Sequence, residues 1–298
     1  MKNSKRNRGF HGNRPERDVS AAYGRPDRGS LEPVRPRIVQ SQCFRMSQVK
    51  PQTFHKFAPL IGTSGWTYDG WRGPFYPNRE RKRDWLRFYA ARFPTTEING
   101  SFYRTPSLEA VRCWRDDTPE SFRFAWKASK FITHWKRLSE KCDNSIALME
   151  TRLETLEPKL AAVLFQLPPQ FSKNRERLDS FLRMLPRHHR YAFEFRHRSW
   201  YDDDILETLR ERDVALCISD HHDAPAPWET TASHVYVRGH GPAGHYRDSY
   251  ASRTLARWAD AIALWQRQRR IVLVYFDNDQ KAAAPKDARR LIRRLRGG

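Results

Sequence analysis

Eight short apolar segments alternate with helix-like ones along this chain, and each apolar segment ends in polar residues. Segments rich in Val, Ile, Phe and Tyr are typical of buried parallel strands. An eightfold strand–helix alternation predicts an α/β fold of the TIM type, a closed (β/α)8 barrel whose C-terminal strand ends meet at one mouth, where the active site normally lies. The predicted strands span residues 60–64, 95–99, 122–127, 161–166, 191–195, 215–220, 234–238 and 271–277.

The intervening segments predict seven helices. Two of them follow good N-cap residues, Ser107 and Asn174, and the acidic residues 202–204 would complement the helix dipole of a third. The segment after the sixth strand contains Pro225 and Pro227 and predicts no helix. The predicted helices span residues 82–92, 108–116, 144–156, 175–185, 203–212, 252–268 and 285–296.

Residues 1–56 are rich in Arg, Gly, Pro, Asn and Ser and lack apolar periodicity. This composition cannot bury enough surface to offset chain entropy, so we expect a disordered tail before a barrel domain at residues 57–298. The tail carries 13 Lys and Arg against 4 Asp and Glu. Either translation begins at Met46, or the segment is a basic arm for nucleic acid. In both cases, deleting residues 1–45 should leave the melting temperature of the barrel unchanged.

The formal net charge of +21 favours anionic partners such as nucleic acid or phosphorylated metabolites, although a basic solvated surface gives the same count. The four cysteines are scattered without metal-ligand spacing, which argues against a zinc ribbon or a disulfide framework and favours a reducing compartment. Apolar stretches such as residues 160–167 are shorter than the roughly 20 residues that span a bilayer. We therefore expect a cytoplasmic protein with no membrane partner.

Side chains alternate between the two faces of a strand, so alternate residues share a face. In six predicted strands, one alternating set leads to a polar residue at the C-terminal end. If these sets face inward, a ring of charge lies at the mouth above apolar layers. Either a catalytic site or a buried salt-bridge layer would produce this pattern. The sets are Thr95, Glu97 and Asn99; Ala162, Leu164 and Gln166; Ala192, Glu194 and Arg196; Leu216, Ile218 and Asp220; Tyr236, Arg238 and His240; and Leu273, Tyr275 and Asp277.

Ordered motifs over residues 59–295 resemble those of the DUF72, or YecE-like, family. The motifs include Ile61-Gly62-Thr63-Ser64-Gly65-Trp66, Phe75-Tyr76-Pro77, Thr96-Glu97-Ile98-Asn99, Gln166-Leu167-Pro168-Pro169, Glu194-Phe195-Arg196-His197, Tyr236-Val237-Arg238 and Tyr275-Phe276-Asp277-Asn278. The resemblance implies a TIM-type barrel and leaves the chemistry open, because the family is defined without a function. Asp277-Asn278 stands where the family usually has Asn-Asn, which makes this mouth more acidic.

The candidate catalytic residues are Glu194, Asp220, Glu97 and His240. Glu194 and Asp220 end adjacent strands, which lie about 4.8 Å apart, so their carboxylates could form an acid–base pair or bind a divalent metal. Glu194 could instead be paired with a cation and be purely structural. His240 has the inward phase and could carry protons near neutral pH. The sequence names no cofactor, and a divalent metal at the oxygen-rich strand ends is an open alternative.

The candidate ligand-binding residues fall into three kinds. Lys127, Arg196 and Arg238 could hold phosphate or carboxylate, unless they neutralise the mouth acids instead. Polar amides could orient a ligand, and aromatic side chains could stack on a sugar or base or simply seal the loops. The amides are Asn99, Gln166 and Asn278, and the aromatics are Trp66, Tyr103 and Trp200.

These residues support an enzyme that acts on a polar, anionic small molecule such as a sugar phosphate or nucleotide-like compound, by acid–base hydrolysis or isomerisation. Glu194 and Asp220 would carry the protons. Two alternatives remain: a nucleic-acid-binding protein or barrel nuclease, and a noncatalytic ligand-binding barrel. The pattern carries no signal for oligomeric state.

Overall fold

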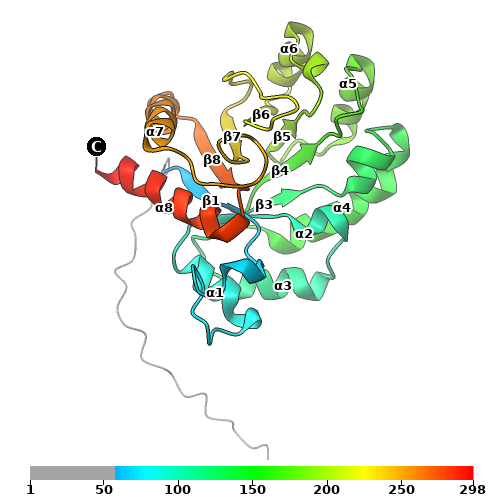
Figure 1. The fold of residues 1–298 in the computed structure, drawn as a ribbon. Coiled ribbons are helices and arrows are strands. Elements are labelled where there is room, and N and C mark those ends of the chain that lie inside the picture. Colours follow the sequence, from blue (N-terminus) through cyan, green and yellow to red (C-terminus); the bar gives the residue numbers. More distant parts are fainter. Residues whose placement is uncertain (1–57, 298) are drawn as a thin grey trace, which may run out of the picture. The chain divides into compact units, whose positions relative to one another are not determined.

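The computed structural model describes residues 58–297, and the predicted tail at residues 1–56 therefore lies outside the described residues. Eight parallel strands close into a barrel in which each strand pairs with its neighbours in sequence and β8 pairs with β1 (Figure 1). The predicted TIM-type fold is confirmed. The strands are β1 (Leu60–Ser64), β2 (Thr95–Ile98), β3 (Arg123–Lys127), β4 (Leu160–Gln166), β5 (Tyr191–Glu194), β6 (Ala215–Ser219), β7 (His234–Gly239) and β8 (Ile271–Phe276).

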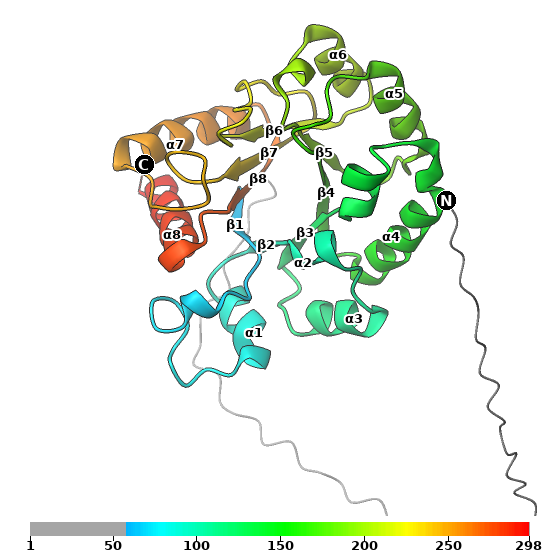
Figure 2. The ribbon, with the colours of Figure 1, turned by 45° about the vertical axis from the view of Figure 1, so that its right-hand side comes forward.

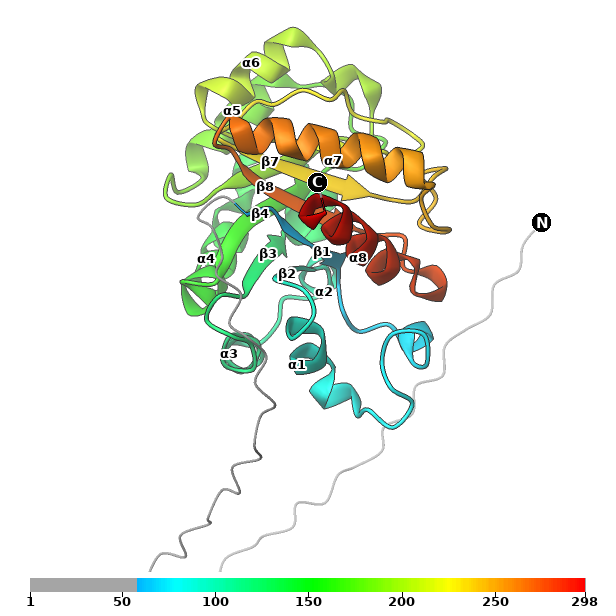
Figure 3. The ribbon, with the colours of Figure 1, turned by 90° about the vertical axis from the view of Figure 1, so that its left-hand side faces the viewer.

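Helices surround the strands and shield their outer faces (Figure 2). The last two helices lie side by side along the barrel wall (Figure 3). Ser107 and Asn174 accept N-cap hydrogen bonds, as their positions predict. The helices are α1 (Trp85–Ala90), α2 (Gly100–Tyr103), α3 (Leu108–Asp116), α4 (Asp143–Leu156), α5 (Arg175–Met184), α6 (Asp203–Glu211), α7 (Ser252–Arg267) and α8 (Ala283–Arg296).

One helical prediction needs correction, and one short helix was not predicted. The helix expected at residues 82–92 is a 3-10 turn at Lys82–Asp84 followed by the short α1. The single turn of α2, directly after β2, was not predicted because four residues are too few to show a helical period. Within residues 58–297, no helix combines the length and apolarity needed to cross a membrane.

The side chains that fill the barrel interior are small on one side and large on the other. Strands β3 to β6 contribute alanines, including Ala162 and Ala192, whereas β7 and β8 contribute Tyr236 and Tyr275. The rings of these two tyrosines lie 5.1 Å apart, centroid to centroid. The tyrosines therefore occupy room that the alanines leave, and the barrel is a packed core.

The predicted phase of the sixth strand is wrong. Leu216 and Ile218 belong to the outer core between strands and helices, whereas Cys217 belongs to the interior cluster. Ser219 faces inward and donates a hydrogen bond to Glu194. The strand ends at Ser219, and Asp220 lies beyond it. Alternate residues counted back from Asp220, which are Ile218 and Leu216, therefore face the helices and not the barrel interior.

Candidate active site

Arg238 on β7 is the centre of a buried charge cluster at the C-terminal mouth of the barrel, and its side chain is fully buried. Its Nη2 atom lies 2.8 Å from Oε1 of Glu97 and 2.9 Å from Oδ2 of Asp277. Its Nη1 atom lies 2.8 Å from Oε2 of Glu194. Nη2 also donates to Oγ of Ser64 at 3.0 Å. One guanidinium thus binds side chains from or directly after β1, β2, β5 and β8.

Glu194 on β5 is held between two guanidinium groups. Nη2 of Arg196 lies 2.7 Å from its Oε1, in addition to the contact with Arg238. Burial alone would raise the pKa of Glu194, but Arg196 and Arg238 outweigh burial and hold this pKa well below its usual range. Glu194 is therefore a fixed anion at neutral pH.

Glu97 on β2 is fixed by hydrogen bonds to both of its carboxylate oxygens. Ser64 donates to Oε1 at 2.5 Å, and the hydroxyl of Tyr236 donates to Oε2 at 2.6 Å. Tyr236 also belongs to the interior packing layer, so this bond connects the apolar layer to the charge cluster. Ser64 and Ser219 are site residues that the sequence analysis missed, because a serine at a strand end is too common to stand out.

The imidazole of His240 lies between Glu194 and Asp220. Its Nε2 is 3.4 Å from Oε1 of Glu194, and its Nδ1 is 3.4 Å from Oδ1 of Asp220. Arg196 and Arg238 each donate to Nε2 at 3.1 Å, so we assign the proton of the neutral ring to Nδ1. Burial, assisted by Arg238 and Arg196, holds the pKa of His240 well below its usual range. Glu194 and Asp220, the two predicted proton carriers, are thus separated by the neutral His240 and each lie near one of its ring nitrogens.

Asp220 lies at the edge of this cluster, just after β6. Its Oδ1 accepts a hydrogen bond from the backbone N–H of His240 at 2.6 Å, and its Oδ2 accepts one from the hydroxyl of Tyr250. Burial raises the pKa of Asp220 to about 6, although both hydrogen bonds oppose the rise. A carboxyl with this pKa changes protonation state near neutral pH.

Lys127 at the end of β3 differs from the other mouth cations. Its side chain is buried, with 6% of the residue exposed, and its Nζ lies 3.3 Å from Oδ1 of Asn99 and 4.4 Å from the centre of the Phe102 ring. Among residues 58–297, no carboxylate lies within 4.0 Å of this ammonium group. Burial, with a contribution from Arg238, lowers the pKa of Lys127 to about 8.

Asp277 follows β8 and contacts Arg238, as described above. Burial raises the pKa of Asp277 to about 6, even though the charges of Arg238 and Lys127 act in the opposite direction. Lys127 and Asp277 are therefore two buried groups of opposite charge whose pKa values both approach neutrality. This convergence is typical of acid–base sites.

A loop residue, Tyr246, closes one side of the mouth. Its hydroxyl accepts a hydrogen bond from Nη1 of Arg196 at 2.9 Å, and its ring packs edge-on against His240 and His221. The sequence analysis missed Tyr246, since the loop between β7 and α7 has no periodicity that would place one of its side chains.

Three predicted ligand-binding residues contact groups outside the charge cluster. Trp200 is fully buried and stacks on Phe195, so it packs the outer core. Asn278 is buried and donates to Asp287 and to the backbone of the β7–α7 loop. Gln166 is at the end of β4, in register with Glu194, and donates to the carbonyl of Leu167.

The remaining two aromatic residues line a cleft beside the mouth. This cleft has a volume of about 620 Å³ and lies between α1 and α3. Trp66 is mostly buried there against Trp114, whereas Tyr103 is 66% exposed. Asn99 also lines the cleft and contacts Lys127, which connects the cleft to the charge cluster.

A further prediction is a divalent metal at the oxygen-rich strand ends. Among the described residues, two groups of His and acidic side chains are close enough to share a metal ion, and neither contains Glu97, Glu194 or Asp277. Those three carboxylates bind Arg238 instead.

Comparison with known proteins identifies the family of this chain. It is 28% identical over 270 residues to the UPF0759 protein YunF of Bacillus subtilis, which covers 79% of this chain and 94% of that protein. It is 31% identical over 141 residues to the UPF0759 protein YecE of Escherichia coli K12, covering 45% and 52%. A crystal structure of a DUF72 family protein from Thermotoga maritima has a TM-score of 0.73 at 25% identity and covers 80% of this chain and all of that one. Residues 60–298 match the family described as "Protein of unknown function DUF72", so the chain belongs to the DUF72 family.

Proposed function

We propose that this protein is an enzyme that binds a small anionic molecule at the barrel mouth and transfers protons to and from it. The observation that carries the proposal is Lys127, a buried ammonium without a carboxylate partner among the described residues. Burying an unpaired charge is costly, so such a cation is an appropriate site for an anionic ligand group. Phosphate or carboxylate would give this ammonium the direct anionic partner that it lacks among the described residues.

Asp277 and Lys127 are the proposed proton carriers. At pH 7 a carboxyl with a pKa of about 6 is mostly ionised, and an amine with a pKa of about 8 is mostly protonated. Asp277 can therefore accept a proton from the ligand while Lys127 donates one or holds an oxyanion. Removal and return of a proton is the chemistry of an isomerase, and proton transfer to a leaving group is that of a hydrolase.

The other charged residues have supporting roles in this proposal. Glu194 is too strongly stabilised as an anion to donate a proton at neutral pH, so it fixes the positions of Arg196 and Arg238. Asp220 and neutral His240 form a second route by which a proton could leave the cluster.

The test is a calorimetric binding screen with inorganic phosphate, sugar phosphates and nucleotides. Lys127→Met should reduce phosphate binding at least tenfold. Lys130→Met is the matched control, because Lys130 lies on the same rim next to the exposed Tyr103 and Trp135. It should change the affinity less than twofold. Equal losses in both variants would mean that general surface charge, and not Lys127, binds the anion.

Catalysis is tested separately with any bound compound. Turnover should rise as the pH increases through about 6 and fall above about 8, following the pKa values of Asp277 and Lys127. Asp277→Asn should abolish turnover. Binding without turnover in the wild-type protein would favour the noncatalytic ligand-binding alternative.

Nucleic-acid binding is the second candidate, because exposed aromatic rings flank a lysine at the rim. Tyr103 and Trp135 are 66% and 67% exposed, and Nζ of Lys130 lies 5.8 Å and 5.4 Å from their ring centres. Aromatic rings beside cationic groups bind single strands by stacking. In this case the protein should bind a single-stranded oligonucleotide with an affinity that falls steeply with salt. Trp135→Ala should weaken this binding more than Lys127→Met does.

A further inference from the structure

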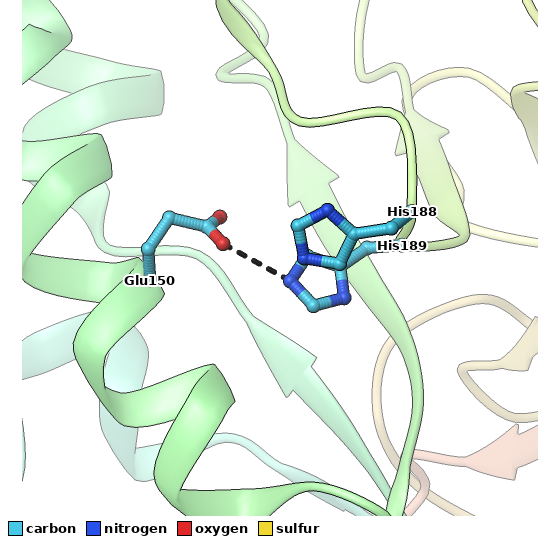
Figure 4. Close-up of side chains that lie close together, drawn as sticks. All are labelled: Glu150, His188 and His189. Carbon is cyan, nitrogen blue, oxygen red and sulfur yellow. Dashed lines mark hydrogen bonds and ion pairs between the residues drawn. The ribbon is translucent and has the colours of Figure 1, made fainter.

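Two adjacent histidines approach a glutamate from a neighbouring helix at the N-terminal end of the barrel. His188 and His189 lie in the loop between α5 and β5, and Glu150 extends toward their rings from α4 (Figure 4). β5 begins two residues after His189, at Tyr191, whereas the charge cluster of the mouth lies at the other end of the strands. This group is therefore separate from the candidate active site.

The donor atoms of Glu150, His188 and His189 all lie within 4.8 Å of one another. Nε2 of His189 is 3.0 Å from Oε2 of Glu150, and the two imidazole rings lie 3.9 Å apart, centroid to centroid. Ligand atoms of a tetrahedral zinc ion are separated by about 3.4 Å, which follows from bonds of about 2.0–2.1 Å. The distance of 3.0 Å between Nε2 of His189 and Oε2 of Glu150 is close to this separation, and the side chain of His188 is exposed.

A second carboxylate lies on the far side of His189. Oε1 of Glu157 is 3.6 Å from Nδ1 of His189, while Nε2 faces Glu150. Histidines that bind metals commonly direct their other ring N–H toward a carboxylate, which fixes the tautomer and orients the ring. The side chain of His189 is only 2% exposed, so its ring is already held in this orientation.

Unsatisfied polar atoms also surround the group. Oε1 of Glu150 is buried and has no hydrogen-bond partner among residues 58–297, and the same is true of the hydroxyl of Tyr191. The ring of Tyr191 lies 6.2 Å from that of His189. Buried polar groups without partners are rare, and an ion that binds the Glu150 carboxylate would satisfy one of them.

We propose that Glu150, His188 and His189 bind a divalent transition-metal ion of the zinc type, with Glu157 orienting His189. Two imidazoles and a carboxylate suit zinc and disfavour magnesium and calcium, which prefer oxygen ligands alone. With three protein ligands, the fourth position is left to water. The ion links α4 to the segment that leads into β5 and thereby stabilises the N-terminal end of the barrel.

A second group at the mouth provides an internal control for this proposal. His221, His222 and Asp223 after β6 also lie within reach of one ion. There, however, Nδ1 of His222 already contacts the carbonyl oxygen of Gly244 at 3.1 Å, and Nε2 lies 3.2 Å from Oδ1 of Asp223. The two groups share no residue. His222→Ala removes a histidine from the group after β6 and leaves the proposed site unchanged.

The experiment titrates the full-length, chelator-treated protein with Zn²⁺ by calorimetry and with Co²⁺ by visible absorption, using Mg²⁺ as the negative ion. The wild-type protein should bind one equivalent of Zn²⁺ and show the absorption of tetrahedral Co²⁺. Glu150→Gln and His188→Ala should each weaken Zn²⁺ binding at least tenfold, whereas His222→Ala should change it less than twofold. The melting temperature should rise with Zn²⁺ in the wild type and not in His188→Ala.

His188 is exposed, so its removal should leave the fold intact, as circular dichroism would verify. Two results would overturn the proposal. One is wild-type affinity in both Glu150→Gln and His188→Ala. The other is loss of binding in His222→Ala alone, which would assign the ion to the loop after β6.

Discussion

The Nη2 atom of Arg238 lies 2.8 Å from Oε1 of Glu97 inside the barrel, and neither side chain is exposed. Arg238 also binds Glu194 and Asp277, so its removal would leave three buried carboxylates short of a counter-charge. Removing one partner of a buried ion pair typically costs about 3–5 kcal/mol.

Arg238→Met should therefore lower the free energy of unfolding by at least about 3 kcal/mol, measured by urea denaturation. If that variant does not fold, Arg238→Lys should still be clearly destabilised, because one ammonium cannot reproduce a guanidinium fork. Arg253→Met, on the exposed surface of α7, is the control and should change little. A loss below about 1 kcal/mol in Arg238→Met would contradict the central role of this residue.

Lys127→Met should stabilise the protein at pH 7. The pKa of Lys127 is about 8 in the folded state and about 10.4 in an unfolded chain, so the fold disfavours the charged amine. The gain should be at most about 3 kcal/mol, since one pKa unit corresponds to about 1.4 kcal/mol. It should shrink as the pH rises from about 8 toward 10, where the wild-type amine is neutral.

Urea denaturation of both proteins between pH 7 and pH 9.5 measures this difference, with Lys130→Met as the comparison. A variant that is less stable than the wild type at every pH would show that Lys127 has a structural role. A gain in stability together with a loss of anion binding would instead identify Lys127 as a residue kept for function.

Glu194→Gln should destabilise the protein at pH 7 by about 3 kcal/mol, because Arg196 and Arg238 lose a shared counter-charge. The pKa of Glu194 is lowered in the folded state, so its stabilising effect is present above the unfolded pKa of about 4.3. The effect is lost as the pH falls through the folded pKa. The difference in the free energy of unfolding between variant and wild type should thus decrease at strongly acidic pH.

Stability measurements from pH 7 down to pH 3 test this expectation. Glu207→Gln serves as the matched control, since Glu207 pairs with Arg210 on the surface of α6 and its side chain is 62% exposed. It should have almost no effect at any pH. If Glu194→Gln lowers the free energy of unfolding by the same amount at pH 3 as at pH 7, the glutamate contributes through its shape and not through its charge.

Tyr250→Phe should raise the pKa of Asp220 above its value of about 6. The hydroxyl of Tyr250 donates to Oδ2 of Asp220 and stabilises the carboxylate, so removing it favours the protonated form. The carboxyl carbon shift of Asp220, followed by NMR across pH, measures the change. Tyr246→Phe, which loses a hydrogen bond to Arg196, should leave that pKa unchanged. A lower pKa in Tyr250→Phe would contradict the assigned hydrogen bond.

The sequence predicted the positions of the strands well, because each buried run is bounded by polar residues. All eight strands match within about one residue at each end. The inward phase was correct where a charged residue interrupts the strand, as at Glu97, Glu194 and Arg238. It failed at β6, where Ala215, Leu216 and Cys217 are all apolar and give no alternation.

Pairing within the site could not be read from the sequence. Which carboxylate meets which cation depends on the stagger of the strands around the closed barrel, a global property. Trp200 illustrates the same limit, since a tryptophan after a strand can face the mouth or the outer core. Here it stacks on Phe195 and is buried.

The uneven filling of the barrel interior links packing to chemistry. Tyr236 belongs to the same interior cluster as small residues such as Ala192, and its hydroxyl donates a hydrogen bond to Oε2 of Glu97. A larger side chain on β4 or β5 would push this ring and thereby displace the carboxylate that Arg238 binds. Substitutions deep in the apolar layer can therefore alter the mouth without contacting it. Apolar residues of β4 and β5 that are equally hydrophobic are not interchangeable, because their size sets the position of the Tyr236 hydroxyl.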